Sequence, residues 1–86
     1  MSAERVTEIR RRLEAAFEPS ILEIEDQSHM HVGHAGAASG GGHFAVRIEA
    51  AALAGVNRVK QHRMIYHALG EMMGAEIHAL SIEVET

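Results

Sequence analysis

The sequence contains no cysteine, which excludes a disulfide framework, a thiol nucleophile and any thiolate metal ligand supplied by the chain itself. Aromatic residues are nearly as scarce, at two phenylalanines and one tyrosine, so aliphatic and methionine side chains must fill the core. Base stacking on exposed rings is therefore not expected. There is also no long apolar run and no segment that resembles a signal peptide, so we expect a cytoplasmic protein with no membrane association.

The length of 86 residues predicts one domain, spanning residues 1–86, with a core just large enough to fold alone. The formal net charge of −4 opposes non-specific attraction to nucleic acid, although a local basic patch can still bind it. Seven histidines raise that charge once the pH falls below about 6.5.

Hydrophobic periodicity places a helix and two strands in the first half of the chain. A helix is predicted from Ser2 to about Phe17, and Pro19 stops it. Alternating apolar residues predict strands at 21–26 and 43–49, which should pair antiparallel. The basic run at 10–12 is interpreted as a solvated helix face.

The second half is predicted to be a helix that leads directly into a strand. Asn57 is a good N-cap, and Gly74 is expected to end the helix. A strand follows, with His78 as the first residue of its inward row. On a helical wheel the residues predicted to face the core are Val59, His62, Ile65, Tyr66, Leu69, Met72 and Met73.

Together these elements predict an α+β fold in the order α-β-β-α-α-β, with a three-stranded mixed sheet and helices on one face. The segment 50–55 is predicted to be a short helical turn or an irregular bridge, with Leu53 as its buried side chain. The helix that follows it is a crossover, which places the second and third strands parallel.

The segment 27–42 is far longer than an ordinary hairpin loop and holds five glycines and three histidines. His29, His31 and His34, with His43 at the loop exit, offer imidazole nitrogens to a metal ion. This spacing is a weak signal, and on the spacing alone a solvated glycine-rich loop with polar side chains is the favoured interpretation. If the loop folds over the end of the sheet, His34 or His29 approaches His78.

Two further groups have competing interpretations. His62 lies within the predicted apolar stripe, which favours a packed core histidine over a metal ligand. Lys60, Arg63 and His67 share the outer face of the same helix, either as a solvated stripe or as a docking surface for an acidic partner. No catalytic triad spacing or phosphate-binding glycine motif is present, so we do not expect an enzyme.

Several motifs together resemble the BolA family. They are Q-H-R-M-I-Y at 61–66 and I-H-A-L at 77–80, preceded by D-Q-S-H at 26–29, G-H at 33–34 and H-F at 43–44. The similarity spans nearly the whole chain. It implies a fold similar to the second type of KH domain, in agreement with the element order predicted from periodicity.

The resemblance also implies a function. BolA-like proteins are partners of monothiol glutaredoxins, with which they can share a [2Fe-2S] cluster, and some are described as DNA-binding transcriptional regulators. By similarity His78 is a cluster ligand and His34 the loop ligand, with His29 and His31 as neighbouring alternatives. Because this chain has no thiolate, the remaining ligands would come from the partner's cysteine and its bound glutathione.

The sequence therefore supports three hypotheses about function. The first is an iron-sulfur accessory protein, a monomer or weak homodimer when alone, whose glutaredoxin docks beside His78 and the helix cations. The second is a DNA-binding regulator that uses Arg58, Lys60, Arg63 and His67. The third is a metal-binding or pH-sensing module built on the loop histidines without a partner.

Overall fold

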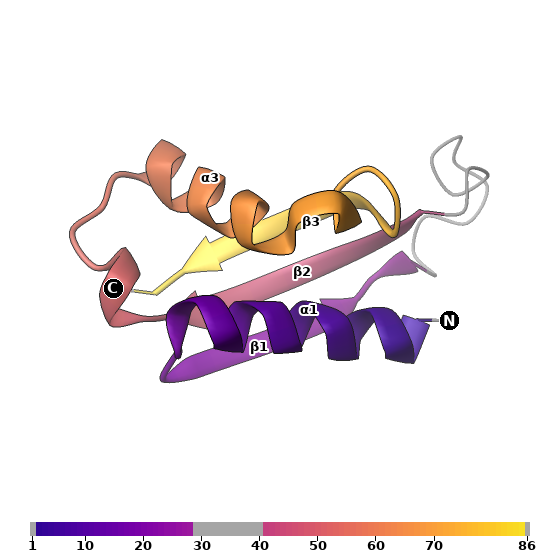
Figure 1. Ribbon diagram of the computed structural model, residues 1–86, viewed down its shortest axis with the longest axis horizontal. Coiled ribbons are helices and arrows are strands. Elements are labelled where there is room, and N and C mark those ends of the chain that lie inside the picture. The colour runs from indigo at the N-terminus through magenta and orange to yellow at the C-terminus, as the bar shows by residue number, and fades with distance from the viewer. Residues whose placement is uncertain (1, 29–40, 86) are drawn as a thin grey trace.

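The computed structural model describes residues 2–28 and 41–85, and two long helices cover one face of a three-stranded sheet (Figure 1). The opposite face of the sheet is open. The elements are α1 (Ser2–Phe17), β1 (Ile21–Asp26), β2 (Gly42–Glu49), the 3-10 turn η2 (Ala51–Leu53), α3 (Arg58–Leu69), the 3-10 turn η3 (Gly70–Met72) and β3 (Ile77–Val84). No helix within the described residues is long and apolar enough to cross a bilayer.

The sheet has the strand order β1-β2-β3, with β2 in the centre. β1 and β2 pair antiparallel, from Ile21 opposite Glu49 to Asp26 opposite Phe44. β2 and β3 pair parallel, connected by α3 as the crossover. The predicted α+β architecture, with both pairings, is therefore confirmed.

The core lies between the sheet and the two helices. Ile9 and Leu13 of α1 and alternate residues of β2 face this core, and Leu53, as predicted, is fully buried at the turn between β2 and α3. α1 ends where Glu18 adopts a left-handed φ of 48° immediately before Pro19. The buried apolar residues are Ile9, Leu13, Phe44, Val46, Ile48, Ala50, Leu53, Ile65, Leu69, Met72 and Ile77.

The orientation of α3 differs from the prediction. Its buried residues are Gln61, Ile65 and Leu69, whereas Val59 is 62% exposed and Tyr66 39% exposed. A polar residue occupies the buried position because the Gln61 side-chain amide donates a 2.8 Å hydrogen bond to the Leu53 carbonyl.

The interpretation of His62 as a packed core residue is consequently wrong. The His62 side chain is only half-buried and lies edge-on to Tyr66, with 6.4 Å between ring centroids. The observed buried face of α3 is rotated about the helix axis by roughly one residue from the predicted face. A helical wheel alone does not distinguish two faces that lie this close together.

The end of α3 also falls earlier than predicted. The helix stops at Leu69, because Gly70 takes a left-handed φ of 57° and its amide donates to the Tyr66 carbonyl. Gly74, the predicted terminator, has a φ of 89° but lies in the turn that precedes β3.

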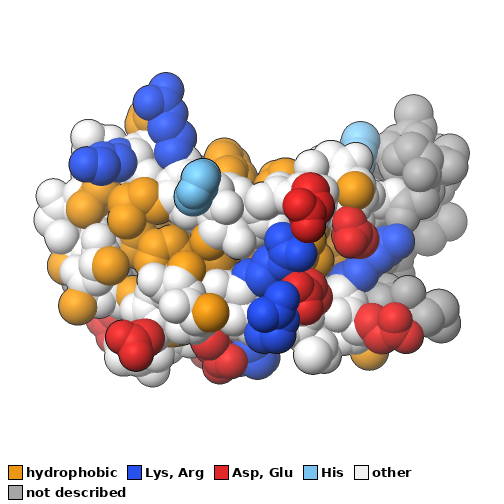
Figure 2. Space-filling view, viewed as in Figure 1, with side chains coloured by type: hydrophobic (Ala, Val, Ile, Leu, Met, Phe, Trp, Pro, Cys, Tyr) orange, Lys and Arg blue, Asp and Glu red, His pale blue; other side chains and the backbone are white. Residues whose placement is uncertain are grey.

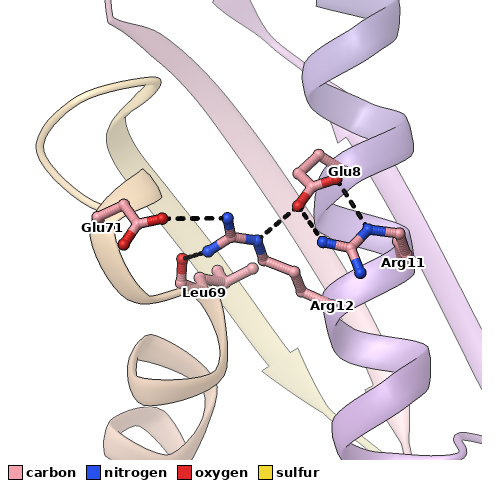
Figure 3. A network of polar contacts seen from close by, with 5 residues as sticks. All are labelled: Glu8, Arg11, Arg12, Leu69 and Glu71. Carbon is pink, nitrogen blue, oxygen red and sulfur yellow. Dashed lines mark hydrogen bonds and ion pairs between the residues drawn. The ribbon is translucent and has the colours of Figure 1, made fainter.

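Arg12 connects the two helices (Figure 3). Its guanidinium donates a 2.6 Å hydrogen bond to the Leu69 carbonyl at the end of α3, and it also contacts Glu8 and Glu71. Hydrogen bonds from Arg11 and then Arg12 hold the pKa of the Glu8 carboxyl at about 2. The expectation of a purely solvated basic run is therefore wrong for Arg12, which satisfies the Leu69 carbonyl at the end of α3.

Candidate functional site

Two histidines from neighbouring strands meet at one end of the sheet. His43 belongs to β2 and His78 to β3, and their ring centroids lie 5.3 Å apart with 47° between the ring planes. His78 is exposed and His43 is half-buried. The sequence motifs identify both residues, but only the parallel register of the two strands brings them together.

A shift in that register explains why His78 faces outward. Gly42 is paired with Ile77, yet the next residue, His43, is paired with Ala79, so β3 carries one extra residue at this point. Ile77 is therefore buried while His78 and Ala79 are both exposed. The prediction that His78 begins the inward row is wrong, because a β-bulge changes the phase of the alternation at the start of the strand.

Hydrogen bonds fix the two ends of the connection between β1 and β2 beside this pair. The Gln27 amide donates to the His43 carbonyl at 2.7 Å, and the His43 amide donates to the Ser28 hydroxyl at 3.1 Å. The Gly42 amide donates to the Glu76 carbonyl at 2.9 Å. The backbone that carries His43 is thus held on both sides.

Gly41 allows the chain to pass directly against His78. A Cβ atom at position 41 would lie 2.8 Å from the His78 Cβ, closer than real side chains approach each other. The sequence shows five glycines in this segment, but it does not show which of them is required by packing.

The histidine pair has the chemistry of an incomplete metal site. A metal ion about 2 Å from one nitrogen of each ring, at a tetrahedral angle, places the two centroids about 5 Å apart. The observed 5.3 Å is compatible with this arrangement. Residues 2–28 and 41–85 contain no cluster of three His, Asp or Glu side chains that would hold a metal alone. His29, His31 and His34 lie outside the described residues.

The cations of α3 lie elsewhere. Lys60 and Arg63 are in the first half of α3, at the end of the molecule opposite the start of β3 (Figure 1). The prediction that Lys60, Arg63 and His67 flank His78 as one docking surface is therefore wrong for Lys60 and Arg63, because the helix begins at the far end of the sheet. His67 lies in the last turn of α3. All three, like Arg58, are exposed.

These cations border an apolar groove of about 1020 Å³ between the end of α1 and α3, which we name the α1–α3 groove. Its apolar lining includes Phe17 and Met64, and none of the described residues that line it carries a carboxylate. Figure 2 shows hydrophobic side chains gathered at this end of the molecule, with Lys and Arg side chains along one edge.

The open face of the sheet has the opposite charge. Arg47 forms ion pairs with Glu23 at 3.2 Å and Glu85 at 3.3 Å, and Glu83 lies beside Glu85. A hydrogen bond from Glu83, and then one from Arg47, lowers the pKa of the Glu85 carboxyl, while the bond to Glu85 raises the pKa of Glu83. Polyanions such as DNA are therefore disfavoured on this face.

Comparison with known sequences gives a consistent family assignment. The model of the family described as BolA-like protein matches residues 13–86. The chain is 41% identical to the chloroplastic protein BOLA1 of Arabidopsis thaliana over 95% of its own length, but spans only 53% of that protein. It is 37% identical to the DNA-binding transcriptional regulator BolA of Escherichia coli, covering all of this chain and 76% of that one.

Solved structures agree with the sequence comparisons. The BolA domain of SufE1 from Arabidopsis thaliana superposes with a TM-score of 0.82 at 40% identity, covering 95% of this chain and 91% of that one. BolA1 of Mus musculus gives a TM-score of 0.76 at 34% identity, covering 93% of this chain and 63% of that one. With its fold, its motifs and these relatives in agreement, the chain belongs to the BolA-like family.

Proposed function

We propose that this protein is an iron-sulfur accessory protein that holds a [2Fe-2S] cluster jointly with a monothiol glutaredoxin. The observation that carries the proposal is the pairing of His43 and His78 at one end of the sheet, in a chain that has no cysteine. A [2Fe-2S] cluster accepts two imidazoles on one iron, but the other iron takes thiolates. Two histidines and no thiol therefore suit half of a cluster site.

Within that half-site, each residue has a definable part. The exposed His78 presents an imidazole to a partner that approaches the end of the sheet. The second imidazole comes from His43, or from His34 or His29 of the adjacent segment. The glutaredoxin cysteine and glutathione complete the ligands, and the bound cluster supplies transferable iron and sulfide or a redox-sensitive signal. The proposed role of the protein is that of an accessory protein. Its cytoplasmic location remains a prediction.

The test is reconstitution of the complex with a monothiol glutaredoxin, glutathione, iron and sulfide, followed by visible absorption and circular dichroism. We expect His78→Ala to alter the spectrum and shorten the lifetime of the cluster, with a smaller or equal effect for His43→Ala. His67→Ala is the matched control, because His67 is an exposed histidine that lies on α3.

Identical spectra and identical cluster loss for the wild type and His78→Ala would contradict ligation by this residue. If His43→Ala is silent while His34→Ala alters the spectrum, the second ligand belongs to the 29–40 segment instead.

A second candidate function is DNA binding, which relatives in Escherichia coli and Haemophilus influenzae carry in their names. Three exposed cations of α3 favour it here. Among residues 2–28 and 41–85, no ion pair involves Arg58, Lys60 or Arg63. Three or four phosphate contacts would give a slope of roughly −3 in log affinity against log salt concentration.

Fluorescence anisotropy with a labelled duplex at two salt concentrations tests this candidate. We expect Arg63→Glu to weaken binding and reduce the salt slope by about 1. No salt-sensitive binding at micromolar protein concentrations would remove DNA as a direct ligand.

A further inference from the structure

The α1–α3 groove is a second surface that the cluster function does not use. Its floor is apolar and includes Phe17, Met64 and Val59, and one edge is lined by Lys60 and Arg63. Val59 is 62% exposed, and it lines the same groove as Phe17 and Met64, so it belongs to a contiguous apolar patch rather than standing alone. The groove therefore combines exposed apolar area with positive charge on one side.

No ion pair neutralises the positive charge of this edge within residues 2–28 and 41–85. All twelve Asp and Glu residues of the sequence fall among the described residues, and none of them forms an ion pair with Lys60, Arg63 or His67 there. By contrast, Arg12 and Arg47 each contact two carboxylates.

The cations follow the geometry of the helix. Positions 60, 63 and 67 are one and two turns apart on α3, so they form a row about 10 Å long beside the apolar floor. A complementary helix would carry acidic residues at the same spacing next to an apolar stripe. DNA phosphates would contact the cations and leave the apolar floor exposed to water.

We propose that the α1–α3 groove binds an acidic amphipathic helix of a partner protein. Apolar side chains of that helix would cover Phe17, Val59 and Met64, and its carboxylates would pair with Lys60 and Arg63. Met64 suits such a floor because its unbranched side chain adapts to different partners. The groove and the histidine pair lie at opposite ends of a molecule whose longest extent is 38 Å, so the two sites do not overlap.

The probe is a labelled synthetic peptide of about 18 residues, long enough to form a helix, with leucines on one face and a glutamate row spaced i, i+3, i+7 beside them. Two control peptides replace the glutamates by lysines or the leucines by serines. Binding to the apo-protein is followed by fluorescence anisotropy, and the contact surface is mapped by amide chemical shifts in NMR spectra.

Variants of the protein separate the contributions of charge and apolar area. We expect Arg63→Glu to weaken peptide binding about fivefold at low salt, with much of that difference lost at about 500 mM salt. Arg5→Glu is the matched control, because it makes the same charge change on α1 outside the groove lining. Val59→Ser should weaken binding about fivefold, whereas Tyr66→Ser removes an exposed side chain outside the groove lining and should not.

Each alternative occupant gives a distinct result that overturns the proposal. Equal binding of the lysine peptide would show that the cations do not select an acidic helix. Tighter binding of sodium decanoate than of the glutamate peptide would identify a small anionic amphiphile. Binding of a DNA duplex that is sensitive to Arg63→Glu but not to Val59→Ser, with no peptide binding, would assign the edge to nucleic acid. His78→Ala should leave peptide binding unchanged, so the outcome is independent of the cluster function.

Discussion

Replacement of Gln61 by methionine tests the contact that orients α3. The side chain is 7% exposed, and its amide donates 2.8 Å to the Leu53 carbonyl. Methionine keeps nearly the same length and volume but cannot donate. The Leu53 carbonyl keeps its 3.3 Å bond from the Val56 amide, so loss of the Gln61 bond should cost about 0.5–1.5 kcal/mol. The more apolar side chain offsets part of this cost, and we expect a net loss of about 1 kcal/mol in the free energy of unfolding.

For a domain of this size, a loss of about 1 kcal/mol corresponds to a fall in Tm of about 4–8 °C. Urea unfolding followed by circular dichroism measures the change, with an unchanged m value as evidence that the native fold persists. Gln27→Met is the matched control, because Gln27 donates to Glu25 in an exposed hydrogen bond, and its loss should change stability by less than about 0.5 kcal/mol. If the two variants are equally stable, the bond from Gln61 to Leu53 does not orient the helix.

Three further predictions follow from single contacts. The pKa of Glu8 is lowered from 4.5 to about 2 in the folded state, so its stabilising contribution is complete above pH 4.5 and disappears as the pH falls through 2. The stability difference between wild type and Glu8→Gln, measured by denaturation at several pH values, should therefore close over that pH window. A difference that stays constant would contradict this prediction. Gly41→Ala should displace His78 through the 2.8 Å Cβ contact, so the NMR signals of the His78 ring should shift, and an unchanged spectrum would show that the two segments do not touch. Asn57→Ala should lower the free energy of unfolding by about 1 kcal/mol, because the 2.9 Å N-cap bond from the Lys60 amide is lost. Asn57→Asp should retain this bond and the wild-type stability. Equal urea midpoints for the wild type and both variants would refute this prediction.

The sequence was sufficient for the element order because strong local signals mark most boundaries. Pro19 follows the end of α1, Asn57 caps α3, and the apolar alternation of β2 is regular along the strand. These signals depend on backbone geometry that neighbouring residues determine, so they survive tertiary packing. The parallel pairing then followed from the crossover through α3.

Features set by tertiary contacts were not predicted correctly. The buried face of α3 depends on the hydrogen bond between Gln61 and Leu53, a tertiary contact that a helical wheel does not show. As a result Val59 is exposed and lines the α1–α3 groove. The outward position of His78 depends on one extra residue in β3, which changes the period of two at a single point. In each case hydrophobicity alone was an ambiguous guide, because two phases of the pattern fit equally well.

The candidate site was predicted in part. The sequence identified both His78 and His43 as candidate ligands but did not place them side by side, since their contact requires the strand register. Lys60 and Arg63 were correctly assigned to one exposed helix face, but their distance from His78 along the molecule depends on the direction of α3 across the sheet.

The parallel pairing of β2 and β3 also has a kinetic consequence. Long segments of chain separate the strands of both pairs. β3 can pair with β2 only after the whole α3 crossover has been arranged, so the entropy lost on closing this long connection opposes the pairing during folding. We expect the contact between His43 and His78 to form late, after the folding transition state. A ligand that bridges the two rings would then slow unfolding far more than it speeds folding, and would lengthen the lifetime of the native state.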